Sequence, residues 1–220
     1  MKHGEASLPI AVLVSGRGSN MINIAQCAAR GELPVRVCAV VSDKADAPAL
    51  AAAQQMAIPT AALRAQGFAD RVQYDRALGD LVESHEPALV VLAGFMRILS
   101  PEFIGRFAGR ILNVHPSLLP KYRGLHTHRR ALEAGDRVHG ASIHFVTEEL
   151  DGGPVIIQAA VAIRPDDDAP SLSARVQQLE HRIYPMAIDW FARGRLALRD
   201  HAAWLDGKPL DTPVRLGDVA

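Results

Sequence analysis

The chain alternates between short runs of apolar residues and longer stretches in which apolar and polar residues are mixed. The apolar runs at 8–15, 35–42, 88–93 and 110–114 have the length of strands and lack a regular polar face. Strands that are apolar throughout are typical of a parallel sheet covered by helices on both faces. The first half of the chain is therefore predicted to be Rossmann-like.

The mixed stretches between these runs have the composition of helices. Residues 20–30 end before a glycine, residues 47–57 are rich in alanine, and residues 68–85 carry apolar side chains at helical spacing. A short helix is predicted to start at Ser100, because a capping residue is followed there by proline. Strands and helices thus alternate as they do in an α/β fold.

The second half of the chain predicts a different arrangement. Helices are expected at 126–134 and 171–193, strands at 140–147 and 155–163, and a hairpin from residue 196 past Trp204. We predict one α/β domain over residues 1–220 that has a mostly parallel sheet and a C-terminal antiparallel extension. Residues 1–7 and 206–220 carry no structural signal and are expected to be mobile.

Composition and charge exclude several classes of protein. The 24 basic and 24 acidic residues give a formal net charge of zero, which argues against broad electrostatic binding of nucleic acid. No apolar run approaches the roughly 20 residues that span a bilayer, and no signal peptide is recognisable. We therefore expect a cytoplasmic protein without membrane contact. Cys27 and Cys38 lie in apolar surroundings and are expected to be buried thiols.

The loop at residues 15–20, Ser-Gly-Arg-Gly-Ser-Asn, joins the first predicted strand to the first predicted helix. Its glycines permit close approach of a ligand, and the N–H groups at the start of a helix attract anions. The third glycine of a dinucleotide fingerprint and the lysine of a P-loop are both missing, so a single phosphate fits better than a pyrophosphate. A tight turn with a helix cap is the alternative interpretation.

Asn113 and His115 are two residues apart at the end of a predicted strand, and such residues point to the same face. An amide donor beside an imidazole can stabilise an oxyanion and move a proton. Asp151 begins a glycine turn, where a carboxylate commonly bonds to its own backbone. If it lies near His115 instead, it favours the cationic imidazole. A zinc site is not indicated, because the spacing of His126, His128, His139 and His144 matches no zinc signature.

Four motifs occur in order along the chain: Ser-Gly-Arg-Gly-Ser-Asn (15–20), Leu-Ala-Gly-Phe-Met-Arg-Ile-Leu-Ser (92–100), Asn-Val-His-Pro-Ser-Leu-Leu-Pro (113–120) and Glu-Leu-Asp-Gly-Gly-Pro-Val-Ile (149–156). In this order they resemble the folate-dependent glycinamide ribonucleotide formyltransferases of the formyltransferase family. The resemblance covers about residues 8–205, and a further match lies at 180–185.

The resemblance implies formyl transfer from 10-formyltetrahydrofolate to the amine of glycinamide ribonucleotide, without a metal. It implies catalytic roles for Asn113, His115 and Asp151. It also implies a phosphate-binding half at 8–114 and a folate-binding and catalytic half at 115–205. The ribotide would be bound by Gly18, Ser19, Asn20 and Glu180. The folate would be bound by Arg71, Met96, Arg97, Ile98, Leu99, Asn113, Thr147, Glu148, Glu149, Leu150 and Asp151.

Several of these residues have an ordinary structural alternative. Glu180 and Arg97 could be solvated charges, and Arg71 lies on a helix that is expected to face solvent. No role is assigned to four further residues, Arg17, Lys121, Arg123 and His144.

The alternatives for function share parts of the pattern. A methionyl-tRNA formyltransferase has the same Asn-His-Asp set, but it carries a further C-terminal domain and a basic surface. A hydrolase that releases formate normally has an extra N-terminal domain. A nucleotide-binding sensor domain and a nicotinamide oxidoreductase are further alternatives. We expect small-molecule substrates and a monomer or homodimer.

Overall fold

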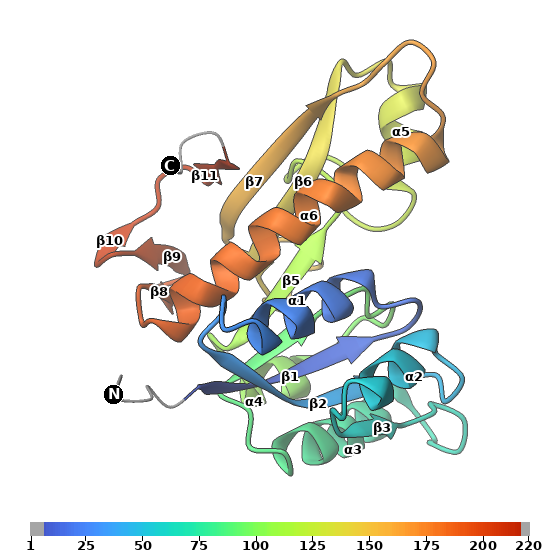
Figure 1. The fold of residues 1–220 in the computed structure, drawn as a ribbon, viewed down its shortest axis with the longest axis vertical. Helices are drawn as coiled ribbons and strands as arrows, with labels where there is room; N and C mark the ends of the chain where they lie inside the picture. Colours follow the sequence, from blue (N-terminus) through green and yellow to red (C-terminus); the bar gives the residue numbers. More distant parts are fainter. Residues whose placement is uncertain (1–6, 217–220) are drawn as a thin grey trace. The chain divides into compact units, whose positions relative to one another are not determined.

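The computed structural model describes residues 7–216, which fall into two units that divide between Leu112 and Asn113. The first unit contains a parallel sheet in the order β3-β2-β1-β4 (Figure 1). Its strands are β1 (Leu8–Val14), β2 (Val35–Ser42), β3 (Thr60–Ala62) and β4 (Leu89–Leu92). The predicted parallel sheet is therefore present, and the apolar side chains of β1, β2 and β4 are buried in it.

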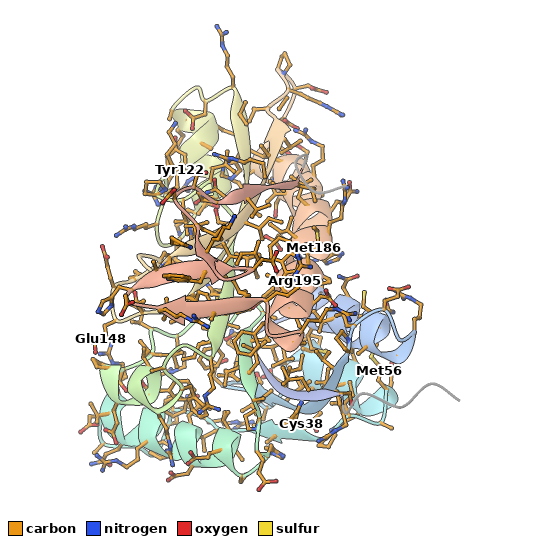
Figure 2. The ribbon with its side chains drawn as sticks, turned by 90° about the vertical axis from the view of Figure 1, so that its left-hand side faces the viewer. Cys38, Met56, Tyr122, Glu148, Met186 and Arg195 are labelled. Atoms are coloured by element: carbon orange, nitrogen blue, oxygen red, sulfur yellow. The ribbon has the colours of Figure 1, made fainter. Side chains whose placement is uncertain are left out.

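Four helices connect the strands of the first unit: α1 (Ser19–Ala29), α2 (Pro48–Gln55), α3 (Arg71–Glu83) and α4 (Pro101–Arg106). Helices α1 and α2 contact each other and β2, and α3 contacts α4. The predicted cap of α4 is confirmed, since the Ser100 hydroxyl accepts a hydrogen bond from the Phe103 N–H. Cys38 is a buried free thiol (Figure 2), and burial raises its pKa.

The second unit contains both antiparallel and parallel strand pairs. Strands β6 (Val138–Phe145) and β7 (Val155–Ala162) are antiparallel, and β11 (Val214–Arg215) runs parallel to β7. Helix α6 (Ala169–Ala192) packs on β6 and β7, and α5 (Thr127–Glu133) precedes β6. A separate antiparallel sheet contains β8 (Leu196–Arg199), β9 (Ala202–Leu205) and β10 (Lys208–Pro209). The predicted C-terminal hairpin is thus confirmed. Strand β5 (Ile111–His115) crosses the boundary between the units.

The Rossmann-like α/β prediction is confirmed, and the differences concern short elements. Strand β3 was not predicted, because its three residues are partly exposed and form no apolar run. The predicted mobility of 206–220 is wrong for the segments that form β10 and β11, whose pairing comes from backbone hydrogen bonds that leave little sequence pattern. The expectations for 1–6 and 217–220 concern segments outside the described residues.

Candidate active site

The imidazole of His115 lies at the end of β5 between two hydrogen-bond acceptors. Its Nε2 donates to the carbonyl of Tyr122 at 2.9 Å, and its Nδ1 lies 3.5 Å from Oδ2 of Asp151. Only 6% of His115 is exposed. Because an acceptor oxygen lies beside each ring nitrogen, this position is suited to a group that donates or relays a proton.

The amide of Asn113 is oriented by a histidine that was given no role from the sequence. Its Nδ2 donates to Nε2 of His144 at 3.0 Å. Nδ1 of His144 in turn donates to the carbonyl of Phe145 at 2.8 Å. These two contacts are satisfied together only by a neutral ring with its proton on Nδ1. Burial favours this state, because it lowers the pKa of His144 to about 4. One N–H of Asn113 is left for a substrate oxygen.

The carboxylate of Asp151 faces the histidines and is not used to close its own turn. Its Oδ2 accepts a hydrogen bond from the N–H of Gly124 at 2.8 Å, and its Oδ1 lies 3.8 Å from Nε2 of His144. The side chain is 10% exposed. The second unit therefore brings Asp151 close to His115 and to His144, the partner of Asn113, although it lies more than 30 residues after β5 in the sequence.

The loop between β5 and α5 supplies backbone partners to this group. The carbonyl of Tyr122 accepts from His115, and the N–H of Gly124 donates to Asp151. The Tyr122 hydroxyl and the Lys121 ammonium group both donate to Asp136, which anchors the loop. Tyr122 and Gly124 cannot be identified from the sequence, because a contact made by a backbone group does not depend on the type of residue.

His128 and His139 form a separate pair. Nε2 of His139 lies 3.1 Å from Nδ1 of His128, and their rings meet edge to face. Burial, with a smaller contribution from His128, lowers the pKa of His139 to about 4. Among residues 7–216 no group of three or more metal-ligating side chains is positioned to hold an ion. The pair is therefore described best as a neutral hydrogen-bonded contact.

The glycine loop of the first unit has a conformation that requires glycine at one position. Gly18 has a φ of 73°, and a Cβ there would lie 2.5 Å from Cβ of the buried Ala49. The carbonyl of Gly18 accepts from the N–H of Ile22 in the first turn of α1. Ser19 and Asn20 begin that helix, so the N-terminal end of α1, where a helix attracts anions, directly follows the loop.

The predicted folate segment 96–99 is connected to the same loop within the first unit. The Ser15 hydroxyl accepts from the N–H of Met96 at 2.8 Å. Met96 and Ile98 are exposed, Leu99 is buried, and the guanidinium of Arg97 lies 4.4 Å from the ring centre of Tyr74. Arg97 also lines a cavity of about 450 Å³ with Asp43, Lys44, Ala45, Asp46, Arg64, Ala65 and Gln66.

The other predicted ligand-binding residues differ in their burial. Glu180, on α6, is only 9% exposed, so the alternative of a solvated surface charge is wrong. Arg71 is the first residue of α3 and is exposed, as the surface-helix alternative expected. Residues 147–150 belong to the same loop as Asp151, and three of them, from Glu148 to Leu150, are exposed.

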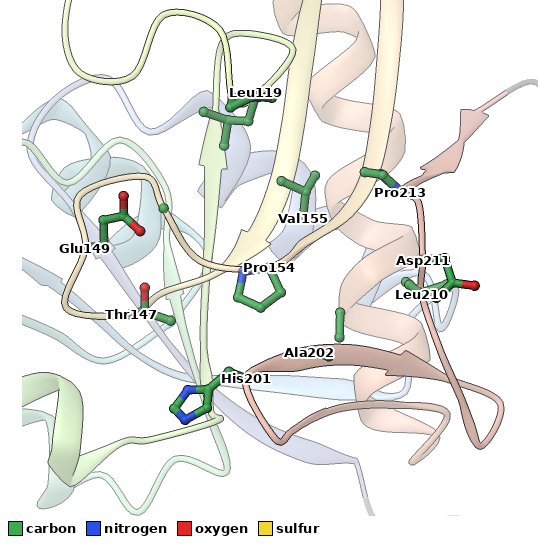
Figure 3. A pocket seen from close by; sticks show the side chains of 13 residues that line it. Leu119, Thr147, Glu149, Pro154, Val155, His201, Ala202, Leu210, Asp211 and Pro213 are labelled. Carbon is green, nitrogen blue, oxygen red and sulfur yellow. The ribbon is translucent and has the colours of Figure 1, made fainter.

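A cavity of about 600 Å³ lies behind that loop in the second unit (Figure 3). Thr147, Glu149 and Gly152 line one side of it, and His201 and Asp211 come from the C-terminal segments. Asn113, His115 and Asp151 do not line this cavity. The cavity therefore leaves the loop without close packing on this side.

The known proteins that this chain resembles are formyl transferases. A family model described as formyl transferase matches residues 8–188. The phosphoribosylglycinamide formyltransferases of Escherichia coli (strain K12) and Haemophilus influenzae are 55% and 49% identical to this chain over 201 residues, which cover 91% of it and 95% of each relative. The solved phosphoribosylglycinamide formyltransferase from Coxiella burnetii is 46% identical with a TM-score of 0.90, over 94% of this chain and 98% of the other. The chain belongs to the formyl transferase family.

Proposed function

We propose that this protein transfers the formyl group of 10-formyltetrahydrofolate to the amine of glycinamide ribonucleotide, a reaction of purine synthesis. The observation that carries the proposal is the group formed by Asn113, His115 and Asp151 in the second unit. Its members are the residues that the family pattern uses for catalysis. The reaction yields formylglycinamide ribonucleotide and tetrahydrofolate.

The chemistry begins with attack of the ribotide amine on the formyl carbon, which converts the formyl oxygen into an oxyanion. The N–H of Asn113 that does not bind His144 and the protonated imidazole of His115 stabilise this charge. When the bond between the formyl carbon and the folate nitrogen breaks, that nitrogen takes a proton, and His115 supplies it. The amine loses its own proton in the same sequence, so protons balance.

Asp151 acts on His115 and on the proton of the amine. Its carboxylate lies 3.5 Å from Nδ1 of His115, and it orients the ring and stabilises its cationic form. Hydrogen bonding to Gly124 fixes one carboxylate oxygen, while the other remains able to accept a proton through a water molecule. A neutral His144 keeps the Asn113 amide in the donor orientation.

Substrate binding is proposed for residues of both halves of the chain. In the phosphate-binding half, 8–114, the ribotide phosphate contacts Gly18, Ser19 and Asn20 at the start of α1. In the catalytic half, 115–205, Glu180 accepts hydrogen bonds from the ribose hydroxyls. The folate contacts Arg71, Met96, Arg97, Ile98, Leu99, Asn113, Thr147, Glu148, Glu149, Leu150 and Asp151.

We further propose that the enzyme acts in the cytoplasm as a monomer or homodimer. No helix within residues 7–216 is long and apolar enough to cross a bilayer.

The test follows the absorbance of the folate with purified protein, with and without the ribotide. Conversion to tetrahydrofolate that requires the ribotide supports the proposal. Equal conversion without it would indicate a hydrolase. Transfer to methionyl-tRNA in place of the ribotide would indicate the related tRNA enzyme.

A further inference from the structure

The turn that carries Asp151 is exposed to solvent at its start and borders a cavity. Residues 148–150 are exposed, and the cavity of Figure 3 lies against Glu149 and Gly152. Asp151 itself has a φ of 49°, a left-handed conformation that a residue with a side chain keeps only when its surroundings support it. Polar contacts must therefore hold the carboxylate near His115.

An ion pair across two loops provides such a contact. Nη1 of Arg123 donates to Oε1 of Glu149. The Glu149 side chain is folded back over the turn, because a Cβ on Gly152 would lie 2.3 Å from Cδ of Glu149. The next residue after Arg123 is Gly124, whose N–H binds Asp151. Arg123 thus binds Glu149 at the start of the turn, and the next residue, Gly124, binds Asp151 further along it.

The loop that presents Arg123 is itself anchored. The carbonyl of Arg123 accepts from Nη1 of Arg130 on α5 at 2.7 Å, and the Arg130 guanidinium lies 5.1 Å from the ring centre of Tyr122. The carbonyl of Tyr122 receives the hydrogen bond from His115. One anchored loop therefore supports both neighbours of the imidazole, the Tyr122 carbonyl directly and Asp151 through Arg123 and Gly124.

We propose that Arg123 is a positioning residue for formyl transfer, which holds the Asp151 turn in place through its ion pair with Glu149. This inference rests on the proposed function. The side chains of Arg123 and Glu149 are 39% and 64% exposed, so the pair contributes little to the free energy of unfolding. Its effect is on geometry, where a displacement of about 1 Å can lower a rate roughly 100-fold.

The first test compares Arg123→Ala with wild type in the full chain. Because the turn is displaced only in part, kcat is expected to fall about tenfold, with the KM of the ribotide and the melting temperature almost unchanged. Arg123→Lys keeps a cation at this position and is expected to retain most of kcat. Arg129→Ala is the matched control, since it removes a similarly exposed ion pair with Glu133 on α5. Wild-type kcat is expected for this control.

The second test asks whether Arg123 acts through Glu149. Glu149 is also a proposed folate contact, so kcat is compared at saturating folate. Under that condition Arg123→Ala combined with Glu149→Gln is expected to lose no more kcat than Arg123→Ala alone, because the same contact is removed twice. The reversed pair, Arg123→Glu with Glu149→Arg, is expected to recover kcat relative to Arg123→Glu alone. This comparison also shows whether Arg123 acts through Glu149 if Arg123→Ala folds poorly.

Three results would overturn the inference. The first is a kcat for Arg123→Ala within about twofold of wild type. The second is a loss in the double variant that equals the product of the losses measured for Arg123→Ala alone and for Glu149→Gln alone. The third is no recovery of kcat in the reversed pair. Each of these results can be measured only if the wild-type protein shows turnover that depends on the ribotide. A wild type that lacks such turnover refutes the proposed function itself, so the two failures are distinguishable.

Discussion

Replacing Asp151 with asparagine tests the charge that faces His115. The substitution keeps the shape of the side chain, and its amide oxygen can still accept from the Gly124 N–H. What is lost is the negative charge 3.5 Å from Nδ1 of His115. The variant should therefore fold normally and react slowly.

The size of the effect follows from that distance. Two unit charges at this separation, with the effective dielectric constant of about 20 that suits protein sites, interact by about 5 kcal/mol. If half of this stabilisation is expressed in the transition state, the loss is roughly 2.5 kcal/mol, or about 100-fold in kcat. A loss of this size lies within the range for groups that handle protons.

The assay measures kcat at saturating concentrations of both substrates, together with the melting temperature. Asp206→Asn is the control, because it removes the charge from another ion pair of the second unit, with Arg195, outside the proposed site. A kcat for Asp151→Asn within about threefold of wild type would refute the reasoning and return Asp151 to the role of a turn former. The double variant His115→Ala with Asp151→Asn should have a kcat only slightly lower than that of His115→Ala alone, since the two residues act as one unit.

Three further predictions concern other parts of the chain. Gly18→Ala combines a left-handed φ with a collision against Ala49, so the free energy of unfolding should fall by about 1–3 kcal/mol in a denaturant titration; an unchanged midpoint would contradict the geometry. Asn20→Ala should raise the KM of the ribotide by about tenfold with kcat little changed, and an unchanged KM would argue against phosphate binding at α1. The pKa of His139 is lowered by burial from 6.5 to about 4, so the unfolded state binds more protons in that interval, and stability is present above pH 6.5 and lost as the pH falls toward 4. His139→Gln should remove the part of this loss in the free energy of unfolding that His139 causes, which is at most about 3 kcal/mol. Identical slopes of the free energy of unfolding against pH for wild type and variant would contradict the assignment.

The parts of the fold that the sequence predicted are those with a long hydrophobic signal. Strands β1, β2 and β4 are continuous apolar runs, and the Ser100 cap with Pro101 marks the start of α4. The short strands β3, β10 and β11 are held by backbone pairing and leave no comparable pattern. Periodicity therefore identifies the core and misses edges and tails.

For the site, the spacing of Asn113 and His115 on one strand was sufficient to propose a carbonyl chemistry. The contact between Asn113 and His144 could not be predicted, because the residues are 31 positions apart and a register shift between Ile143 and His144 disturbs the alternation of β6. The ion pair of Arg123 with Glu149 is likewise a contact between two loops without a periodic pattern. Such contacts depend on tertiary structure alone.

The central claim is that the formyl group passes to the amine of the ribotide. It is tested most directly by supplying 10-formyltetrahydrofolate labelled with ¹³C in the formyl group and following the label by NMR. The label is expected to appear in a formamide of the ribotide, in an amount equal to the tetrahydrofolate formed, and this transfer is expected to be lost in His115→Ala. Label that appears as formate, or transfer that persists at the wild-type rate in His115→Ala, would contradict it.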